Sequence, residues 1–199
     1  MVAVITSATC GAFAATLAQM HRDRKTVFVD QLGWDLPVVD NEQELDEYDT
    51  DAAIYLVAHD GEGGHLGSVR LVSTVGAHLL RDKFPHLCDR LPPAGDDIWE
   101  ITRLCTTPGL KPAHALQIRM ELVVALIEYA LTNGITRYTM MTHIGYLPAL
   151  EGVGWQIERL GQPHVIGRET VVALQIGVAL ATLERLGLPP AIVPVALAA

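Results

Sequence analysis

The chain has 199 residues, of which 50% are apolar and 19% are charged, so it is long enough to bury one substantial hydrophobic core. Its 23 acidic and 14 basic side chains give a net charge of −9, which argues against binding to nucleic acid or insertion into an anionic membrane, since both favour a basic surface. Three cysteines without a CxxC pair and an N-terminus without early basic residues indicate a reduced, cytoplasmic protein without a signal peptide.

The first elements predicted are an edge strand over residues 2–5 and a helix over residues 13–29, which Gly33 and Pro37 terminate. Residues 40–51 are then predicted to form a loop or a short turn. They belong to a stretch from Asp35 to Asp51 that holds eight acids and no base. Such runs are most often solvated surface, although a subset of the acids binding a metal or an organic cation is the alternative.

Three strands are predicted next. Residues 52–59 and 65–74 form a hairpin around the Asp-Gly and Gly-Gly pairs between them, and residues 98–106 alternate as strands do. Residues 113–131 follow as an amphipathic helix, whose predicted buried stripe is Leu116, Met120, Val123, Val124, Ile127 and Leu131.

The remaining elements alternate between strand and helix. They are a strand at 135–142, a helix at 144–153, short strands at 155–160, 164–166 and 170–174, and a helix at 179–186. This order predicts an α/β sandwich with a mixed sheet. No repeat or linker interrupts it, so residues 1–199 are predicted to form a single domain.

Charged residues inside predicted strands are the first candidates for a functional site. Arg70, Glu100 and Arg103 must each be paired or face a polar cavity, because burying a lone charge is expensive. A structural salt-bridge network and a polar pocket are equally open readings. Glu100 and Arg103 have opposite parity, so they face opposite sides of a regular strand unless a bulge lies between them.

An ordered pattern of residues resembles the acyl-homoserine lactone synthases, the LuxI-type autoinducer synthases. The pattern is Arg24-x3-Phe28-x5-Trp34, Asp46-x2-Asp49, Arg70-Leu71, Phe84 and Glu100-x-Thr102-Arg103. The resemblance implies a three-layer α/β/α sandwich with a mixed twisted sheet, similar to that of GNAT acetyltransferases. It also implies two substrates, S-adenosylmethionine and an acyl thioester carried by coenzyme A or by acyl carrier protein. No cofactor and no metal are implied, and a separate receptor-regulator would read the product.

The resemblance assigns roles to individual residues. Glu100 matches the family's catalytic glutamate and is the candidate general base that takes a proton from the substrate amine, through a water. The residues expected to form or brace the S-adenosylmethionine pocket are Arg24, Phe28, Trp34, Asp46, Asp49 and Arg103, with Arg70 and Phe84 in support.

The acyl chain is expected between the sheet and the long helix. Its expected lining is Thr102, Leu104, Leu122, Leu126, Met140, Met141, Ile144 and Leu147, although ordinary core packing accounts for most of these equally well. No Lys or Arg lies between Gly145 and Val153, which favours acyl-coenzyme A over the acidic carrier protein as the donor.

Two other functions stay open at this point. One is a GNAT-type N-acyltransferase that uses acyl-coenzyme A and a different amine acceptor. The other is a sensor or interaction module that binds a nucleoside ligand without turnover.

Overall fold

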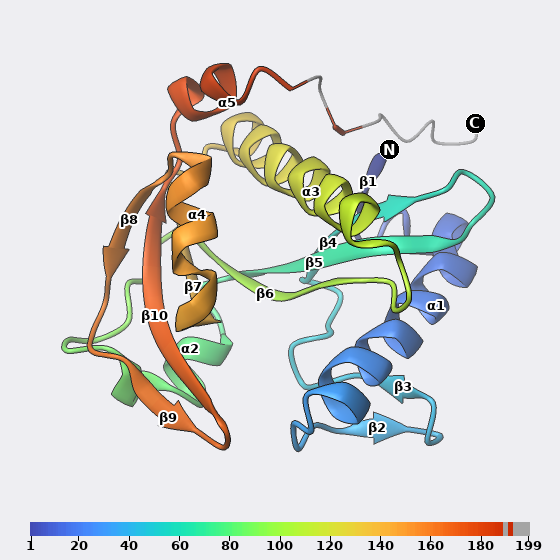
Figure 1. Cartoon of the computed structure of the whole chain (residues 1–199), viewed down its shortest axis with the longest axis horizontal. Coiled ribbons are helices and arrows are strands. Elements are labelled where there is room, and N and C mark those ends of the chain that lie inside the picture. Colours follow the sequence, from blue (N-terminus) through green and yellow to red (C-terminus); the bar gives the residue numbers. More distant parts are fainter. Residues whose placement is uncertain (189–190, 193–199) are drawn as a thin grey trace. The chain divides into compact units, whose positions relative to one another are not determined.

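The computed structural model describes residues 1–188 and 191–192, which form two compact units (Figure 1). The first unit holds Met1–Leu71, Arg103–Leu126 and residues 191–192, and the second holds Val72–Thr102 and residues 127–188. Three elements run along the chain from one unit into the other: β5 (His65–Ser73), β6 (Ile98–Thr106) and α3 (Pro112–Asn133). A single domain over residues 1–199 stays a prediction, and its last seven residues lie outside the described part.

Strands β1 (Val2–Ile5), β4 (Ile54–His59) and β5 form an antiparallel sheet in the first unit. The register pairs Ala3 with Val57 and Val57 with Ser68. The predicted N-terminal strand and the predicted hairpin are therefore confirmed, and β6 is a strand over residues 98–106 as expected.

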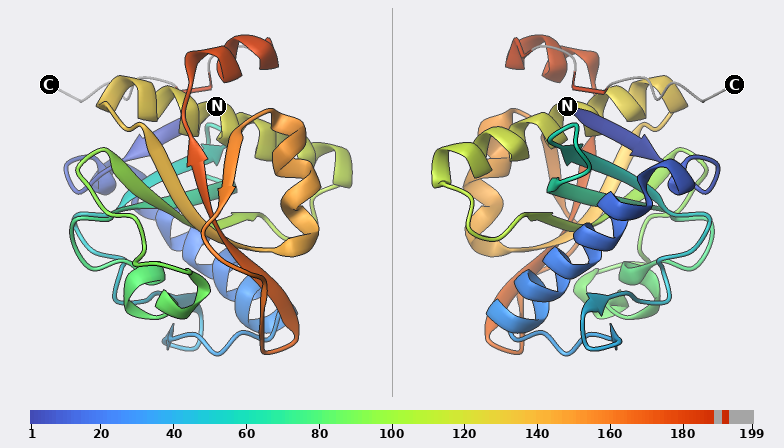
Figure 2. Two further views of the ribbon diagram at one scale, coloured as in Figure 1. Left: turned by 90° about the vertical axis from the view of Figure 1, so that its left-hand side faces the viewer. Right: turned by 90° about the vertical axis from the view of Figure 1, so that its right-hand side faces the viewer.

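Helices cover both faces of this sheet. Helix α1 (Ala14–Arg24) packs Met20 against Ala3 and Val57 on one face, and the views in Figure 2 show this helix, in blue, running obliquely to the strands. Gly67 points to the opposite face, where a Cβ atom would come within 2.6 Å of the Ile118 side chain on α3. A glycine at this position lets α3 lie close to the strand.

The predicted helix over residues 13–29 is present, but it is not a regular α-helix throughout. A 3₁₀ turn, η1 (Cys10–Phe13), precedes α1, and a π-helical segment, η2 (Lys25–Gln31), continues it. The acidic run then contains the short paired strands β2 (Val38–Val39) and β3 (Gln43–Glu44), which the sequence did not predict.

The second unit contains a mixed sheet. The first residues of β6 pair in parallel with β7 (Arg137–His143), and β7 pairs antiparallel with β10 (Glu169–Gly177). Strand β10 also pairs antiparallel with β8 (Gln156–Arg159) and with β9 (His164–Ile166). The predicted α/β fold with a mixed sheet is thus confirmed.

Side chains on β10 alternate between two helical layers. Val171 and Ala173 pack against Leu80 and Leu87, which belong to α2 (Leu79–Asp82) and to the 3₁₀ turn η3 (Pro85–Leu87). Val172 and Leu174 pack against Leu147 at the start of α4 (Leu147–Val153), which follows the short turn η4 (Ile144–Tyr146). Helix α5 (Leu180–Leu186) comes last.

The helices differ from the prediction in two respects. Leu116 and Leu131 were expected in the buried stripe of α3, but they are 56% and 42% exposed, and the buried side chains include Ala115, Ile118 and Leu122 instead. Helix α2 was not predicted, because four residues are too few to show a helical period. No helix among the described residues is long and apolar enough to cross a bilayer.

Candidate active site

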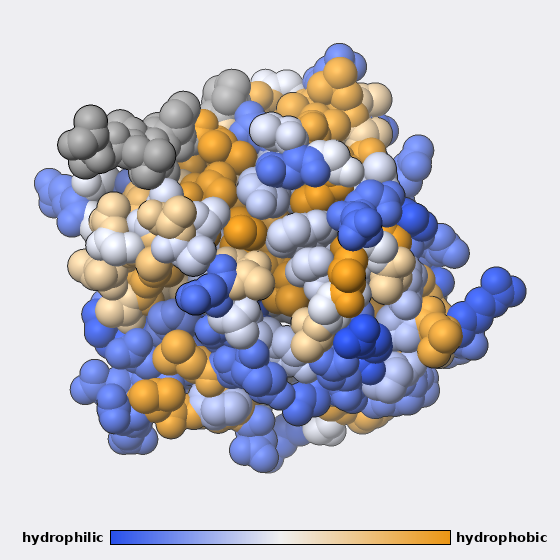
Figure 3. Space-filling view, turned by 180° about the vertical axis from the view of Figure 1, so that it is seen from behind, coloured by the Kyte–Doolittle hydropathy of each residue, from blue (hydrophilic) through white to orange (hydrophobic). Residues whose placement is uncertain are grey.

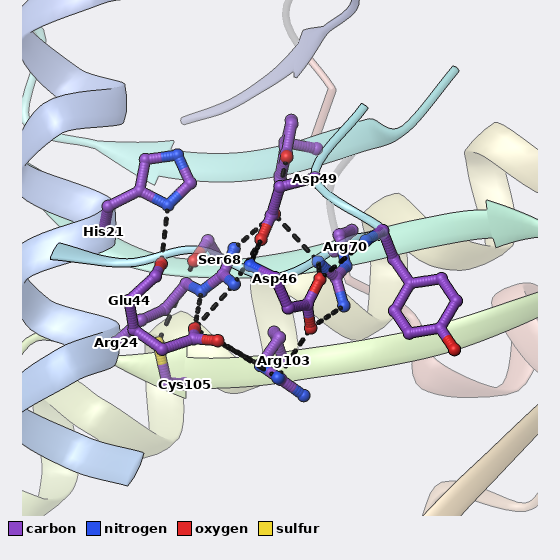
Figure 4. Close-up of polar contacts among 11 residues, drawn as sticks. His21, Arg24, Glu44, Asp46, Asp49, Ser68, Arg70, Arg103 and Cys105 are labelled. Carbon is purple, nitrogen blue, oxygen red and sulfur yellow. Dashed lines mark hydrogen bonds and ion pairs between the residues drawn. The ribbon is translucent and has the colours of Figure 1, made fainter. Parts of the chain in front are cut away.

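Six charged side chains of the first unit form one buried network, called the ionic cluster below. Its members are Arg24, Glu44, Asp46, Asp49, Arg70 and Arg103 (Figure 4). They come from α1, β3, the loop after β3, β5 and β6, so segments distant in sequence meet here. Three guanidinium groups balance three carboxylates, which makes the cluster neutral as a whole.

Arg24 is 1% exposed and lies among the acids of the cluster. Its Nη1 and Nη2 each donate to one oxygen of Asp49 at 2.8 Å, and its Nε donates to Glu44 Oε2 at 2.6 Å. A bidentate pair of this kind fixes both side chains in one orientation. The backbone N–H of Asp46 and the hydroxyl of Tyr55 also donate to Asp49, at 2.8 and 2.7 Å.

The other two arginines hold the remaining carboxylate oxygens. Arg70 donates to both oxygens of Asp46, at 2.6 and 3.0 Å. Arg103 reaches Glu44 Oε1 at 3.0 Å and Asp46 Oδ2 at 2.7 Å. The expected pairing of Arg70 with an acid is therefore present, and Arg103 ties β6 to the acidic loop.

The backbone at Arg103 explains how this side chain reaches the cluster. Its φ is +52°, in the left-handed region that residues other than glycine rarely adopt. Such a residue interrupts the alternation of a strand, so parity no longer assigns Glu100 and Arg103 to opposite faces. Among the described residues other than glycine, only Asp40 and Asn41 share a positive φ, and both lie in a turn.

An aromatic pair adjoins the cluster. Phe28 is buried, and the Trp34 ring stacks on it with centroids 5.0 Å apart and planes inclined by 16°. The Arg103 guanidinium carbon lies 5.7 Å from the Phe28 ring centroid. The three residues of the Arg24-x3-Phe28-x5-Trp34 motif are therefore connected through the cluster and this stack.

The acidic run divides into two groups. Asp46 and Asp49 belong to the cluster, as the pattern predicted, and five other acids are exposed: Asp35, Asp40, Glu42, Glu47 and Asp51. Figure 3 likewise shows hydrophilic side chains dominating the lower part of one face of the chain. The expectation that an acidic run of this kind is solvated surface was wrong for Glu44, which lies outside the family pattern and is completely buried. No signal within an unbroken acidic run distinguishes this residue from its neighbours.

Three carboxylates close together can also bind a metal ion. Oxygens of Glu44, Asp46 and Asp49 lie within 4.8 Å of one another, a spacing that one cation can bridge. Each carboxylate already accepts hydrogen bonds from at least one arginine, however, so a cation would have to displace a guanidinium group. The set therefore suits internal ion pairing better than metal coordination.

The cluster shifts the pKa of the groups around it. Burial alone would raise the pKa of Asp49, but the hydrogen bonds and charge of Arg24 and the charge of Arg70 hold it well below its usual range. For His21, whose Nδ1 lies 3.1 Å from the Glu44 carbonyl oxygen, burial and the neighbouring Arg24 lower the pKa.

We expect acidification to lower the free energy of unfolding in two steps. A histidine whose pKa is depressed by folding contributes stability that is lost as the pH falls below about 6.5, because the unfolded chain then binds the proton more readily. A depressed aspartate pKa contributes stability that is present above about pH 4 and lost below it.

Urea unfolding at about pH 8, 5 and 3 measures this dependence. The variant His21→Gln should flatten the first step and leave the second. A free energy of unfolding that does not change over this range would contradict the assignment.

Glu100 lies in the second unit and is 1% exposed. Its two carboxylate oxygens accept the backbone N–H groups of Leu79 and Leu80, at 2.8 and 2.7 Å, at the start of α2. These bonds fix the orientation of the carboxylate. Phe84 packs against the Leu80–Leu87 cluster of the same unit, in line with a supporting role.

The residues expected to line the acyl pocket fall in both units. Leu104, Leu122 and Leu126 belong to the first unit, whereas the second contains Thr102, Met140, Met141, Ile144 and Leu147. Met140 packs with Leu147 on the α4 side of the sheet, but Met141 packs with Leu80 on the α2 side. The two methionines therefore do not form one continuous wall.

Comparison with known proteins gives a consistent result. The family model described as autoinducer synthase matches residues 12–186. An acyl-homoserine-lactone synthase of Ralstonia nicotianae is 32% identical over 180 residues, covering 87% of this chain and 88% of that protein.

Two solved structures extend the comparison. The CoA-dependent acyl-homoserine lactone synthase BjaI, solved with SAM and isopentyl-CoA, has a TM-score of 0.89 at 25% identity, covering 96% of this chain and 92% of its own. TofI, solved with an inhibitor and MTA, has a TM-score of 0.75 at 31% identity, covering 89% and 92%.

Proposed function

Because the chain belongs to the autoinducer synthase family, we propose that it makes an acyl-homoserine lactone, a quorum-sensing signal, from S-adenosylmethionine and an acyl thioester. The observation that carries this proposal is the convergence of the family pattern. Arg24, Asp46, Asp49, Arg70 and Arg103, spread over 80 positions of sequence in order, meet in one buried network beside the Phe28–Trp34 stack.

The first step is acyl transfer onto the amine of S-adenosylmethionine. The amine nitrogen attacks the thioester carbonyl carbon, a C–N bond forms, the C–S bond breaks, and the thiol leaves. The nitrogen must lose protons on the way, and Glu100 is the general base that receives one, through a water. Its carboxylate is held for this role by the amides of Leu79 and Leu80.

The second step closes the lactone. The methionine carboxylate oxygen attacks the carbon next to the sulfonium, the C–S bond breaks, and its electron pair stays with sulfur, so that methylthioadenosine leaves as a neutral molecule. No acid is required for a leaving group that is already cationic. Since the reaction is intramolecular, the protein mainly has to hold the substrate in a bent conformation.

The six charged residues and the aromatic pair have different roles in the S-adenosylmethionine pocket. The carboxylates of the cluster are already paired with arginines, so Asp46 and Asp49 brace the pocket instead of meeting the sulfonium directly. Phe28 and Trp34 supply a flat surface on which an adenine ring can stack. Arg70 holds Asp46 in place within the first unit, and Phe84 packs beside Leu80 in the second.

Replacing Trp34 by alanine tests this division. We expect the KM for S-adenosylmethionine to rise about tenfold or more, the usual cost of losing one base–aromatic stack, with little change in the KM for the acyl donor. The variant Trp34→Phe, which keeps a ring, should recover most of the affinity. A rise confined to the KM of the acyl donor would count against this pocket layout.

Acyl-coenzyme A is the acyl donor in this proposal. The support is the likeness to BjaI, which is CoA-dependent, together with the lack of basic residues between positions 145 and 153. Acyl carrier protein is the alternative donor. The enzyme is expected to act in the cytoplasm without a cofactor, and a separate receptor-regulator is expected to read its product.

Incubation of the purified protein with S-adenosylmethionine and a mixed acyl-coenzyme A pool tests the function. Release of methylthioadenosine together with an acylated lactone supports it. Acylation without methylthioadenosine would instead indicate a GNAT-type N-acyltransferase with another amine acceptor. Binding of S-adenosylmethionine without turnover would indicate a nucleoside-binding module.

A further inference from the structure

A segment of the second unit, residues 74–80, carries the two amides that hold Glu100, and it is anchored at both ends. At one end, the Thr74 hydroxyl donates to the Ile98 carbonyl oxygen on β6 at 2.7 Å. At the other end, Leu79 and Leu80 donate to the Glu100 carboxylate. The residues between these anchors, 75–77, are exposed to solvent.

His78 lies inside this segment and is completely buried. It occupies the position before α2 but does not cap the helix with its side chain. Its Nδ1 lies 3.0 Å from the carbonyl oxygen of Gly76. Because a carbonyl only accepts, Nδ1 carries a hydrogen and donates this bond.

The two ring nitrogens are used unequally. Nε2 is buried and has no hydrogen-bond partner among the described residues. An unpaired buried polar atom destabilises a fold, so stability alone does not account for a histidine at this position.

We propose that His78 is a positioning residue for Glu100. Its Nδ1–H bond to Gly76 closes the turn that directs the Leu79 and Leu80 amides at the carboxylate. Without this bond the exposed turn has more conformations available, and the carboxylate loses its fixed orientation. This inference rests on the role of Glu100 in the proposed function.

Three substitutions of His78 distinguish the contribution of each ring nitrogen from that of packing. His78→Asn retains an amide donor close to the place of Nδ1, His78→Gln carries its amide near the place of Nε2, and His78→Leu retains only apolar volume. We expect kcat of His78→Leu to fall roughly tenfold, since small misplacements of a reacting group are costly, with both KM values within about twofold of wild type. The thermal midpoint of this variant should be unchanged or higher.

His78→Asn should restore kcat to within about twofold of wild type, and His78→Gln should not. Full kcat in His78→Leu would overturn the proposal, as would recovery by Gln and not by Asn. Parallel losses of kcat and thermal midpoint in both Leu and Asn variants would also overturn it, since they would indicate packing. Wild type is assayed alongside, and its failure to form any lactone would overturn the proposed function instead of the role of His78.

Discussion

Replacing Glu44 by alanine is expected to lower the free energy of unfolding by about 3–5 kcal/mol, the usual cost of removing one partner from a buried ion pair. Glu44 is completely buried and accepts hydrogen bonds from both Arg24 and Arg103. Its loss leaves two carboxylates facing three guanidinium groups, so one positive charge stays buried without compensation. Truncation also opens a cavity in the cluster.

Denaturant unfolding at neutral pH measures this loss. The matched control is Glu42→Ala, two residues away in the same acidic run but exposed, which should change the free energy of unfolding by less than about 0.5 kcal/mol. Glu44→Gln keeps the volume but not the charge and should also be strongly destabilising. Equal stability of the Glu44→Ala and Glu42→Ala variants would contradict the structural role of the cluster.

Replacing Glu100 by glutamine is expected to lower kcat by about 10²-fold or more, which is the scale of general base catalysis. Glutamine keeps the shape of the side chain, but its amide nitrogen cannot accept a proton and faces one of the two backbone N–H groups that now hold the carboxylate. The variant should stay folded, since the side-chain oxygen of glutamine still accepts one of the two backbone N–H groups.

Turnover at saturating concentrations of both substrates measures this effect, and a thermal unfolding curve verifies the fold. Glu184→Gln is a suitable control, because Glu184 is an exposed acid of the same unit on α5. A Glu100→Gln variant that turns over at the wild-type rate would refute the assignment of the base.

Elements with a clear local signal were predictable from the sequence. Strand β6 occupies the expected residues, and the β4–β5 hairpin follows the glycines that mark its turn. Helix α2 has no such signal: it is only four residues long, and its first N–H groups are satisfied by Glu100, a residue 20 positions away. The exposure of Leu116 depends in the same way on which side of α3 faces the sheet.

The candidate site was predictable as a set of residues but not as a geometry. Arg24, Asp49 and Arg70 were identified from their order, yet their mutual pairing needs the folded chain. Glu44 was not predicted as a site residue, because it differs from the exposed Glu42 only in being buried, which the sequence does not reveal. The left-handed backbone at Arg103 determines toward which face of the sheet its side chain points. The sequence alone is compatible both with a regular strand and with a bulge at this position.

The proposed enzyme joins acyl transfer and lactone closure on one substrate. This coupling is tested most directly by quantifying methylthioadenosine and acyl-homoserine lactone in the same reaction of the purified protein, with S-adenosylmethionine and acyl-coenzyme A supplied. We expect the two products to accumulate in equal amounts, and mass spectrometry of the lactone to identify the acyl group. Acylated product that accumulates without methylthioadenosine would contradict this coupling.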